Sequence, residues 1–121
     1  MNVKKKPPPD QGTDMNFTPI CNVDQILPNT GVAALVDGHH VAVFRVGTDA
    51  FHAIDNIDPR SGASVLARGL VGNLGERIVV ASPLYKNHFD LSTGECLEAP
   101  EQSVRAHAVQ VQDGRVLVAL S

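Results

Sequence analysis

The sequence predicts an all-β fold, either an antiparallel β-sandwich or a small β-barrel. Seven short runs rich in Val, Ala, Ile and Leu are separated by Gly, Asp and Asn turn signals, and two of those signals are Asp-Gly pairs. No segment repeats apolar residues at the helical spacing of about 3.6 residues over three turns. The nearest candidate, residues 64–72, is interrupted by Gly69 and Gly72.

The clearest strands lie in the first half of the chain. Residues 32–36 and 39–46 flank Asp37-Gly38, which favours a two-residue type I′ hairpin turn. Residues 50–55 follow after a short turn and extend the hairpin to a three-stranded meander.

The second half continues the same pattern. Residues 77–82 and 88–91 are expected strands, followed by a turn that contains Gly94. Residues 106–112 and 115–121 flank Asp113-Gly114 in a second predicted hairpin. The Gly-rich stretch 69–76 is interpreted as turns between strands.

Composition limits the range of functions. The chain has 121 residues and a net charge of −3, which suit one domain and give no reason to expect a nucleic-acid partner. Residues 1–16 are predicted to be a disordered tail and residues 17–121 the folded domain. No apolar run is long enough for a membrane span, and Cys21 and Cys96 are expected to be reduced thiols, so we expect a cytoplasmic protein without a membrane partner.

No catalytic residue is predicted in this chain. There is no Ser nucleophile elbow, no P-loop and no dinucleotide fingerprint. His39 and His40 are interpreted as exposed turn residues, and His52 and His107 as residues on the solvent face of their strands. Whether the chain counts as an enzyme is left open.

Two loops carry a resemblance to a known family. Residues 57–69 contain Pro59, Gly62 and Ala63, and residues 81–97 contain Pro83 with Phe89-Asp90-Leu91 and Thr93-Gly94. In order and spacing this resembles a Rieske-type ferredoxin domain, in which two loops converge on a 2Fe–2S cluster. The resemblance implies a Rieske-like β fold with a two-loop tip subdomain over the folded region.

The cluster ligands of that family are absent here. Their positions fall on Asp58, Arg60, Ser82 and Tyr85, whereas a Rieske cluster takes two thiolates and two neutral imidazoles. An arginine offers only hydrogen-bond donors and stays protonated, and neutral Ser and Tyr hydroxyls replace soft ligands poorly. We therefore expect no metal and no cofactor on this chain.

This pattern, with Asp58-Pro59 in the first loop and Ser82-Pro83-Leu84 in the second, resembles the small subunits of assimilatory NADH-dependent nitrite reductases. The resemblance implies a non-catalytic accessory subunit of an enzyme that reduces nitrite to ammonium. It also implies a large catalytic subunit as partner, which would hold siroheme, a 4Fe–4S cluster and FAD. The alternatives are a free-standing Rieske-like binding or scaffold module, and a Rieske-type electron-transfer ferredoxin of an oxygenase system.

The loop tip is the predicted partner surface. It would comprise Arg60, Leu84, Tyr85, Lys86, Asn87 and His88. Tyr, Arg and Leu with polar neighbours suit the centre and rim of an interface. The alternative is that Leu84 and Tyr85 fill the space that a cluster would occupy.

Overall fold

A computed structural model describes residues 16–121, so the predicted tail lies outside the described residues apart from Asn16. The described chain is built from strands and three short 3₁₀ turns. The strands are β1 (Thr18–Asn22), β2 (Thr30–Val36), β3 (His39–Val46), β4 (Ala50–Asp55), β5 (Leu70–Leu74), β6 (Arg77–Ala81), β7 (His88–Asp90), β8 (Ala106–Gln112) and β9 (Arg115–Ala119). The 3₁₀ turns are η2 (Val23–Gln25), η3 (Leu66–Arg68) and η4 (Pro100–Gln102).

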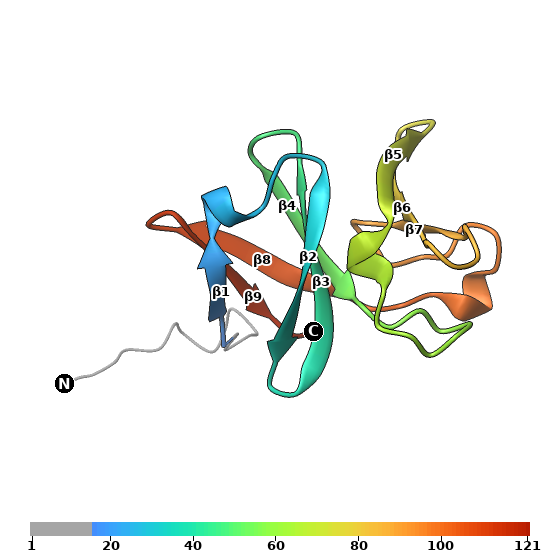
Figure 1. Ribbon diagram of the computed structural model, residues 1–121, viewed down its shortest axis with the longest axis horizontal. Coiled ribbons are helices and arrows are strands. Elements are labelled where there is room, and N and C mark those ends of the chain that lie inside the picture. The colour runs from blue at the N-terminus through green and yellow to red at the C-terminus, as the bar shows by residue number, and fades with distance from the viewer. Residues whose placement is uncertain (1–15) are drawn as a thin grey trace, which may run out of the picture.

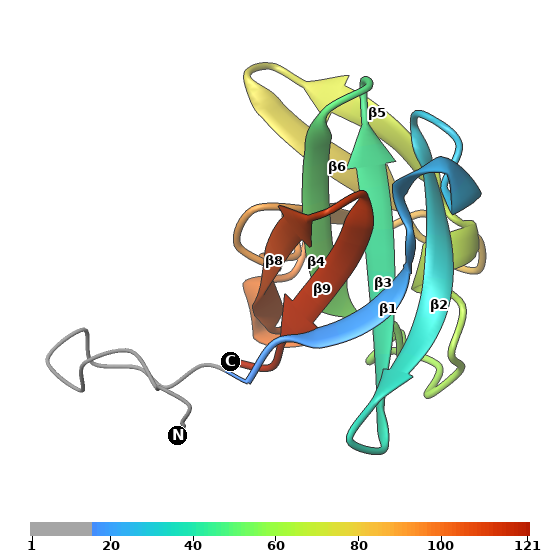
Figure 2. The same cartoon turned by 90° about the vertical axis from the view of Figure 1, so that its left-hand side faces the viewer.

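Six strands form one antiparallel sheet in the order β1-β9-β8-β4-β3-β2. The sheet curls so that its two edge strands approach each other, which makes it a nearly closed barrel (Figures 1 and 2). The predicted all-β fold is confirmed, and its main sheet takes the form of a small antiparallel barrel.

Both predicted hairpins have the expected turn. Asp37 and Gly38 have φ angles of 50° and 81°, and Asp113 and Gly114 have φ angles of 54° and 75°. Positive φ at both central residues defines the type I′ turn, whose twist matches that of the flanking strands. The strands then pair in simple register, with Val36 opposite His39 and Gln112 opposite Arg115.

A smaller sheet, β5-β6-β7, stands beside the barrel (Figure 1). The interpretation of residues 69–76 as turns was wrong, because residues 70–74 form β5 and pair along their whole length with β6. Strand β5 contains Gly72 and Asn73 and lacks the alternation of a half-buried strand. Its conformation comes from pairing with the more apolar β6 across the turn at Gly75 and Glu76.

Two apolar cores flank strand β3. Val41 and Val43 point into the barrel with Ile26, Val116 and Val118. Ala42 and Phe44 point the other way, into a core shared with the smaller sheet, whose buried members include Leu66, Val80, Phe89, Leu91 and Cys96. Burial on both faces explains why β3 is apolar at successive positions instead of alternating.

Two histidines lie differently from the prediction. His107 is buried and its Nε2 lies 2.8 Å from Asp55 Oδ1, so its assignment to a solvent face was wrong. His52 is half-buried, and burial lowers its pKa although the charge of Asp90 acts in the opposite direction. Strand periodicity could not place these side chains, because the smaller sheet and the C-terminal residues cover faces that an isolated barrel would expose.

Gly94 is predicted to be far more sensitive to substitution than Gly75. Both have positive φ, but a Cβ at Gly94 would lie 2.1 Å from the Val104 carbonyl oxygen, whereas a Cβ at Gly75 meets nothing within 4 Å. We expect Gly75→Ala to cost about 1 kcal/mol of unfolding free energy. Gly94→Ala should cost about 3 kcal/mol, since the backbone collision adds to the conformational cost.

Thermal unfolding of the two variants measures the difference. Gly94→Ala should lower Tm at least twice as much as Gly75→Ala. Equal shifts in Tm would mean that the backbone around Gly94 and Val104 accommodates the added Cβ without loss of stability.

Candidate functional site

The two loops predicted from the sequence meet at one end of the smaller sheet. We call residues 56–69, between β4 and β5, loop 1, and residues 82–87, between β6 and β7, loop 2; together they form the tip. The Ser82 hydroxyl donates a hydrogen bond of 2.6 Å to Asp58 Oδ2, and each residue is only 1% exposed. Two of the four positions that hold ligands in Rieske domains are therefore bonded directly to each other.

Loop 1 is shaped by the same aspartate. The second carboxylate oxygen, Asp58 Oδ1, accepts a hydrogen bond of 2.8 Å from the Arg60 backbone N–H. The backbone of Asp58 closes the turn, since its N–H donates to Ala63 O and its carbonyl accepts from Gly62 N–H. Asp58 thus has a carboxylate with partners on both oxygens, in keeping with the rule that buried polar groups are hydrogen-bonded.

Asn56 fixes the remainder of loop 1. Its side-chain oxygen accepts from the Ala67 N–H at 2.7 Å, and its amide donates to Ser64 Oγ at 2.7 Å. These bonds join the second half of loop 1 to its first residue, directly after β4, and they are buried because Asn56 is 1% exposed.

Loop 2 is a tight turn closed by backbone bonds. Ser82 N–H donates to Asn87 O at 2.8 Å, and Lys86 N–H donates to Ser82 O at 3.0 Å. Lys86 has a φ of 61°, a conformation that L residues other than Asn and Asp adopt rarely. The turn directs Leu84 and Tyr85 outward, where they are 50% and 47% exposed.

The other two former ligand positions also contact each other. The Arg60 guanidinium carbon lies 4.7 Å from the centroid of the Tyr85 ring, within the range of a cation–π interaction. This pair lies at the surface, whereas Asp58 and Ser82 lie beneath it. The four positions therefore form an inner hydrogen-bonded pair and an outer stacked pair.

These side chains do not fit a 2Fe–2S cluster. The inner pair offers a carboxylate and a hydroxyl that satisfy each other, and the outer pair offers a guanidinium and a phenol in place of imidazoles. Cys96 is buried in the core and Cys21 lies on β1, so neither belongs to the tip. Within residues 16–121, there is no group of three or more His, Cys, Asp or Glu side chains that could hold a metal ion.

The six predicted interface residues separate into two sets. Arg60, Leu84, Tyr85 and Lys86 are exposed together on the tip. Asn87 is 8% exposed, and His88 is partly buried with its ring Nδ1 2.6 Å from Glu98 Oε2. Burial alone would raise the pKa of Glu98, but hydrogen bonds from the His88 backbone and ring outweigh it and lower that pKa.

Asp90 organises the turn after β7. Its Oδ1 accepts from the N–H groups of Ser92 and Thr93, and its Oδ2 accepts from Arg77 Nε at 2.8 Å. Burial acts to raise the pKa of Asp90, but these hydrogen bonds lower it overall. The carboxylate therefore stabilises the turn after β7 and does not face Asp58.

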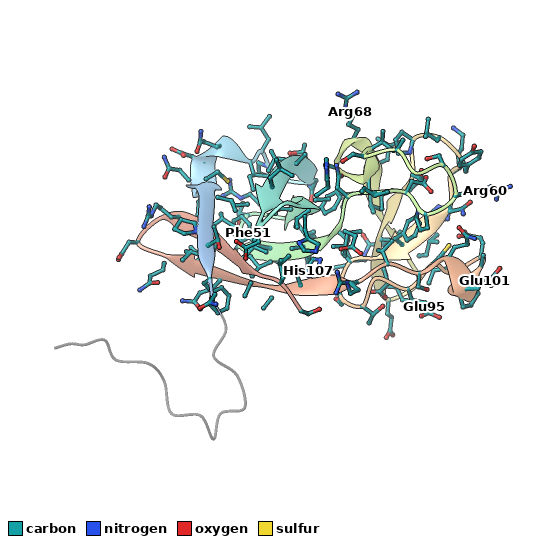
Figure 3. All side chains as sticks on the ribbon, turned by 90° about the horizontal axis from the view of Figure 1, so that it is seen from below. Phe51, Arg60, Arg68, Glu95, Glu101 and His107 are labelled. Carbon is teal, nitrogen blue, oxygen red and sulfur yellow. The ribbon has the colours of Figure 1, made fainter. Side chains whose placement is uncertain are left out.

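Sequence reasoning missed Arg68 and Leu70, which lie at the end of loop 1 and the start of β5. Leu70 is 80% exposed, and Arg68 projects outward on the same half of the molecule as Arg60 (Figure 3). A hollow of about 260 Å³ lies between Arg68, Leu70, Pro83 and Lys86. In the sequence, this surface is indicated only by Leu70 following Arg68-Gly69, in a stretch without clear apolar periodicity.

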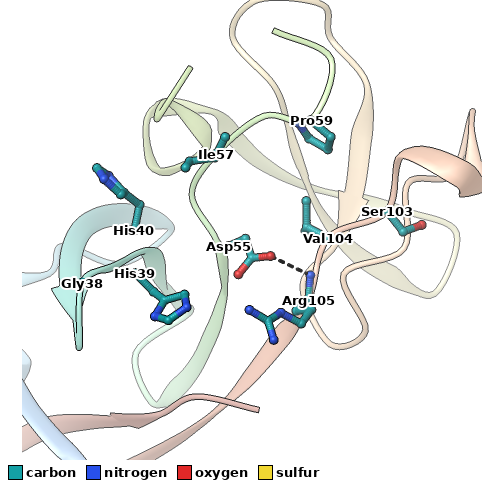
Figure 4. Close-up of a pocket in the computed structure, with 9 residues that line it drawn as sticks. All are labelled: Gly38, His39, His40, Asp55, Ile57, Pro59, Ser103, Val104 and Arg105. Atoms are coloured by element: carbon teal, nitrogen blue, oxygen red, sulfur yellow. Dashed lines mark hydrogen bonds between the residues drawn. The ribbon is translucent and has the colours of Figure 1, made fainter. Parts of the chain in front are cut away.

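A second hollow, of about 410 Å³, lies where loop 1 joins the barrel (Figure 4). Asp55 is its central carboxylate, and it accepts from the Arg105 N–H at 3.1 Å as well as contacting His107. Asp55 therefore ties β4 to β8. His39, His40 and Ser103 also line this pocket, and the Ser103 hydroxyl donates to Pro100 O instead of to a base. His40 Nδ1 lies 2.9 Å from Ser64 Oγ, but Ser64 is not among the lining residues and its hydroxyl also accepts a hydrogen bond from the Asn56 amide.

Removing the Ser82 hydroxyl is predicted to destabilise the fold. In Ser82→Ala the buried Asp58 Oδ2 loses its hydrogen-bond donor, which should cost about 1–3 kcal/mol of unfolding free energy. Ser92→Ala is the matched control, since Ser92 is exposed and its hydroxyl makes no hydrogen bond to the described residues; it should change stability by less than about 0.5 kcal/mol. Chemical denaturation measures both, and equal small changes would show that the inner pair contributes little.

Comparison with known proteins places this geometry in a family. The Rieske-like [2Fe-2S] domain family matches residues 16–119. A nitrite reductase (NADH) small subunit from Salmonella typhimurium is 49% identical over 98 residues, covering 80% of this chain and 91% of that protein. The solution structure of NirD from Escherichia coli superposes with a TM-score of 0.80 at 44% identity, covering 86% of this chain and 96% of that one.

A third relative is much longer than this chain. The nitrite reductase [NAD(P)H] large subunit of Klebsiella oxytoca contains a region 42% identical to this chain over 99 residues, which is 82% of this chain but 10% of that protein. Among the described residues no helix is long and apolar enough to cross a membrane. With its barrel, its two converging loops and these relatives, the chain belongs to the Rieske-like domain family and, within it, to the nitrite reductase (NADH) small subunits.

Proposed function

We propose that this chain is the non-catalytic accessory subunit of a cytoplasmic NADH-dependent nitrite reductase that reduces nitrite to ammonium in nitrogen assimilation, and that it carries no iron–sulfur cluster. The observation that carries the proposal is the replacement of a cluster site by two interlocked side-chain pairs. Asp58 with Ser82 closes the inner position, and Arg60 with Tyr85 closes the outer one. Since these four side chains offer neither thiolate nor imidazole to a cluster, we assign the contribution of the chain to its surface.

On this proposal the electron-carrying groups belong to the large subunit. Siroheme, a 4Fe–4S cluster and FAD need thiolate ligands or a nucleotide-binding loop. This chain has two cysteines, one of them in the core, and no dinucleotide fingerprint. The two subunits then have different roles: the large subunit holds the cofactors that do the chemistry, and this chain binds and positions the large subunit through its surface.

The Klebsiella oxytoca relative supports a direct partnership. A domain 42% identical to this chain lies within a polypeptide that is itself a large subunit. Two domains that occur as separate chains in one organism and as one chain in another are expected to work at close range. This observation favours the large-subunit partner over a free-standing binding module.

We place the docking surface on the exposed part of the tip: Arg60, Leu84, Tyr85 and Lys86. Arg60 stacked on Tyr85 presents an aromatic and a guanidinium already ordered in one geometry, which reduces the entropy lost on binding. Leu84 adds apolar area beside them. Asn87 is 8% exposed, and the backbone N–H and the ring of His88 both bond to Glu98. We therefore leave these two residues out of the proposed docking surface.

The electron-transfer alternative is disfavoured by the same four positions. A Rieske-type ferredoxin requires thiolate and imidazole ligands that the tip does not offer. We expect the small subunit, separated from its native complex, to contain far less than one equivalent of iron and of acid-labile sulfide. Stoichiometric amounts of both would contradict the proposal.

Tyr85→Ala is expected to weaken binding to the large subunit. Loss of an aromatic interface anchor typically costs about 2 kcal/mol or more, which corresponds to about 30-fold in Kd. Val111→Ala is the control, because Val111 is 46% exposed on the β8–β9 hairpin at the opposite end of the molecule (Figure 1). Isothermal titration of the purified large subunit measures both, and an unchanged Kd for Tyr85→Ala would remove the tip from the interface.

A further inference from the structure

We infer that the docking surface continues from the tip into a cationic socket that receives a carboxylate side chain of the large subunit. The socket is the hollow of about 260 Å³ bordered by Arg68, Leu70, Pro83 and Lys86. This inference rests on the proposed function and adds a second contact region with a defined chemistry.

The socket is bordered by cations, since Arg68 and Lys86 line it and none of its other lining residues is acidic. Although the net charge of the chain is −3, none of Arg60, Arg68 and Lys86 has a carboxylate within 4.0 Å in the part of the chain that the structure describes. Arg77, in contrast, binds both Asp90 and Glu95. Arg60 and Arg68 both project from the fold (Figure 3). Two cations that border a hollow lined by no acidic residue complement a carboxylate on a partner surface.

The apolar side of the socket is held rigidly in place. Leu70 is 80% exposed, the highest exposure of any large apolar side chain in residues 16–121. It follows Gly69, where a Cβ would lie 2.2 Å from the Ala81 carbonyl oxygen, so β5 approaches β6 as closely as the backbone allows. Leu70 then pairs with Ala81 in the ladder. Leu70 and Pro83 together give the socket an apolar wall beside its two cations.

The position of Lys86 is determined by strained backbone. Its φ of 61° is maintained by the hydrogen bond from its N–H to Ser82 O, next to the inner pair of the tip. Backbone strain of this kind persists where the surroundings over-determine it, often at binding sites. The strain presents the lysine on the rim of the socket, opposite Arg68.

The socket favours an acidic protein segment as its occupant. Two cations bordering a small hollow, with Leu70 and Pro83 as apolar walls, suit one Asp or Glu side chain next to an apolar neighbour. A nucleic acid needs a longer track of cations than these residues provide, and the overall charge opposes it.

Charge substitutions test the inference in titrations with the purified large subunit. We expect Arg68→Glu to raise Kd about 10-fold in 50 mM salt and to flatten its salt dependence. Lys86→Asn, which removes the charge but tolerates positive φ, should act in the same direction. Arg115→Glu makes the same change of charge on the far hairpin, so it should alter Kd less than about twofold. Tm values check that each variant is folded.

Zero-length crosslinking locates the carboxylate. Lys86 is the only lysine in residues 16–121, so replacing Lys4, Lys5 and Lys6 by Arg in the full chain leaves it as the sole side-chain amine. Carbodiimide treatment of the complex should then join Lys86 to an Asp or Glu of the large subunit, identified by mass spectrometry. Lys86→Asn in the same background should abolish that peptide.

The outcomes separate the two proposals. If Arg68→Glu and Lys86→Asn bind as tightly as Arg115→Glu does, and no peptide joins Lys86 to the partner, the socket inference is wrong while Tyr85→Ala still tests the tip. If the unmodified chain does not bind the large subunit, the proposed function itself is wrong.

Discussion

The two-loop half of the molecule depends on the hydrogen bond between Ser82 and Asp58. Both residues are buried, and their bond is a direct side-chain hydrogen bond between loops that follow different strands of different sheets. In a Rieske domain a cluster with ligands from each loop would make this link. Here a hydroxyl and a carboxylate make it, and each also organises its own loop through backbone contacts. The tip therefore has a defined shape built from this chain's own side chains.

The barrel supplies a fixed base for this tip. Strand β3 is buried on both faces, so it belongs to the barrel core and to the core under the smaller sheet at the same time. Asn56, the first residue of loop 1, donates its backbone N–H to the carbonyl oxygen of His40 on β3 at 2.9 Å, and its side chain accepts from the Ala67 N–H. The turn after β7 is joined to the segment before β8 by the bond from Val104 N–H to Gly94 O at 2.9 Å. Because interiors are densely packed, these connections leave little freedom for the loops to move as separate units.

The exposed chemistry of the tip follows from what replaced the cluster ligands. The inner positions are occupied by Asp58 and Ser82, which hydrogen-bond to each other. The outer positions are occupied by the guanidinium of Arg60 and the phenol of Tyr85, which are exposed to solvent. Arg68, Leu70 and Lys86 extend this surface around loop 2. This end of the molecule thus presents exposed cationic and apolar side chains, on which the proposed contact with an acidic partner segment rests.

Local chemistry in the sequence was sufficient for much of this description. The Asp-Gly turns and the β-branched runs depend on neighbours in the chain, so pattern alone predicted the hairpins. The sequence also indicated directly which residue types occupy the four loop positions, Asp58, Arg60, Ser82 and Tyr85. Tertiary structure decided the rest. Strand β5 exists because β6 pairs with it. His107 is covered by the C-terminal residues, and Asp55, 52 residues away in the sequence, supplies a partner for its ring. The pairing of Asp58 with Ser82 and the exposure of Leu70 likewise depend on contacts between distant segments, which no local pattern records.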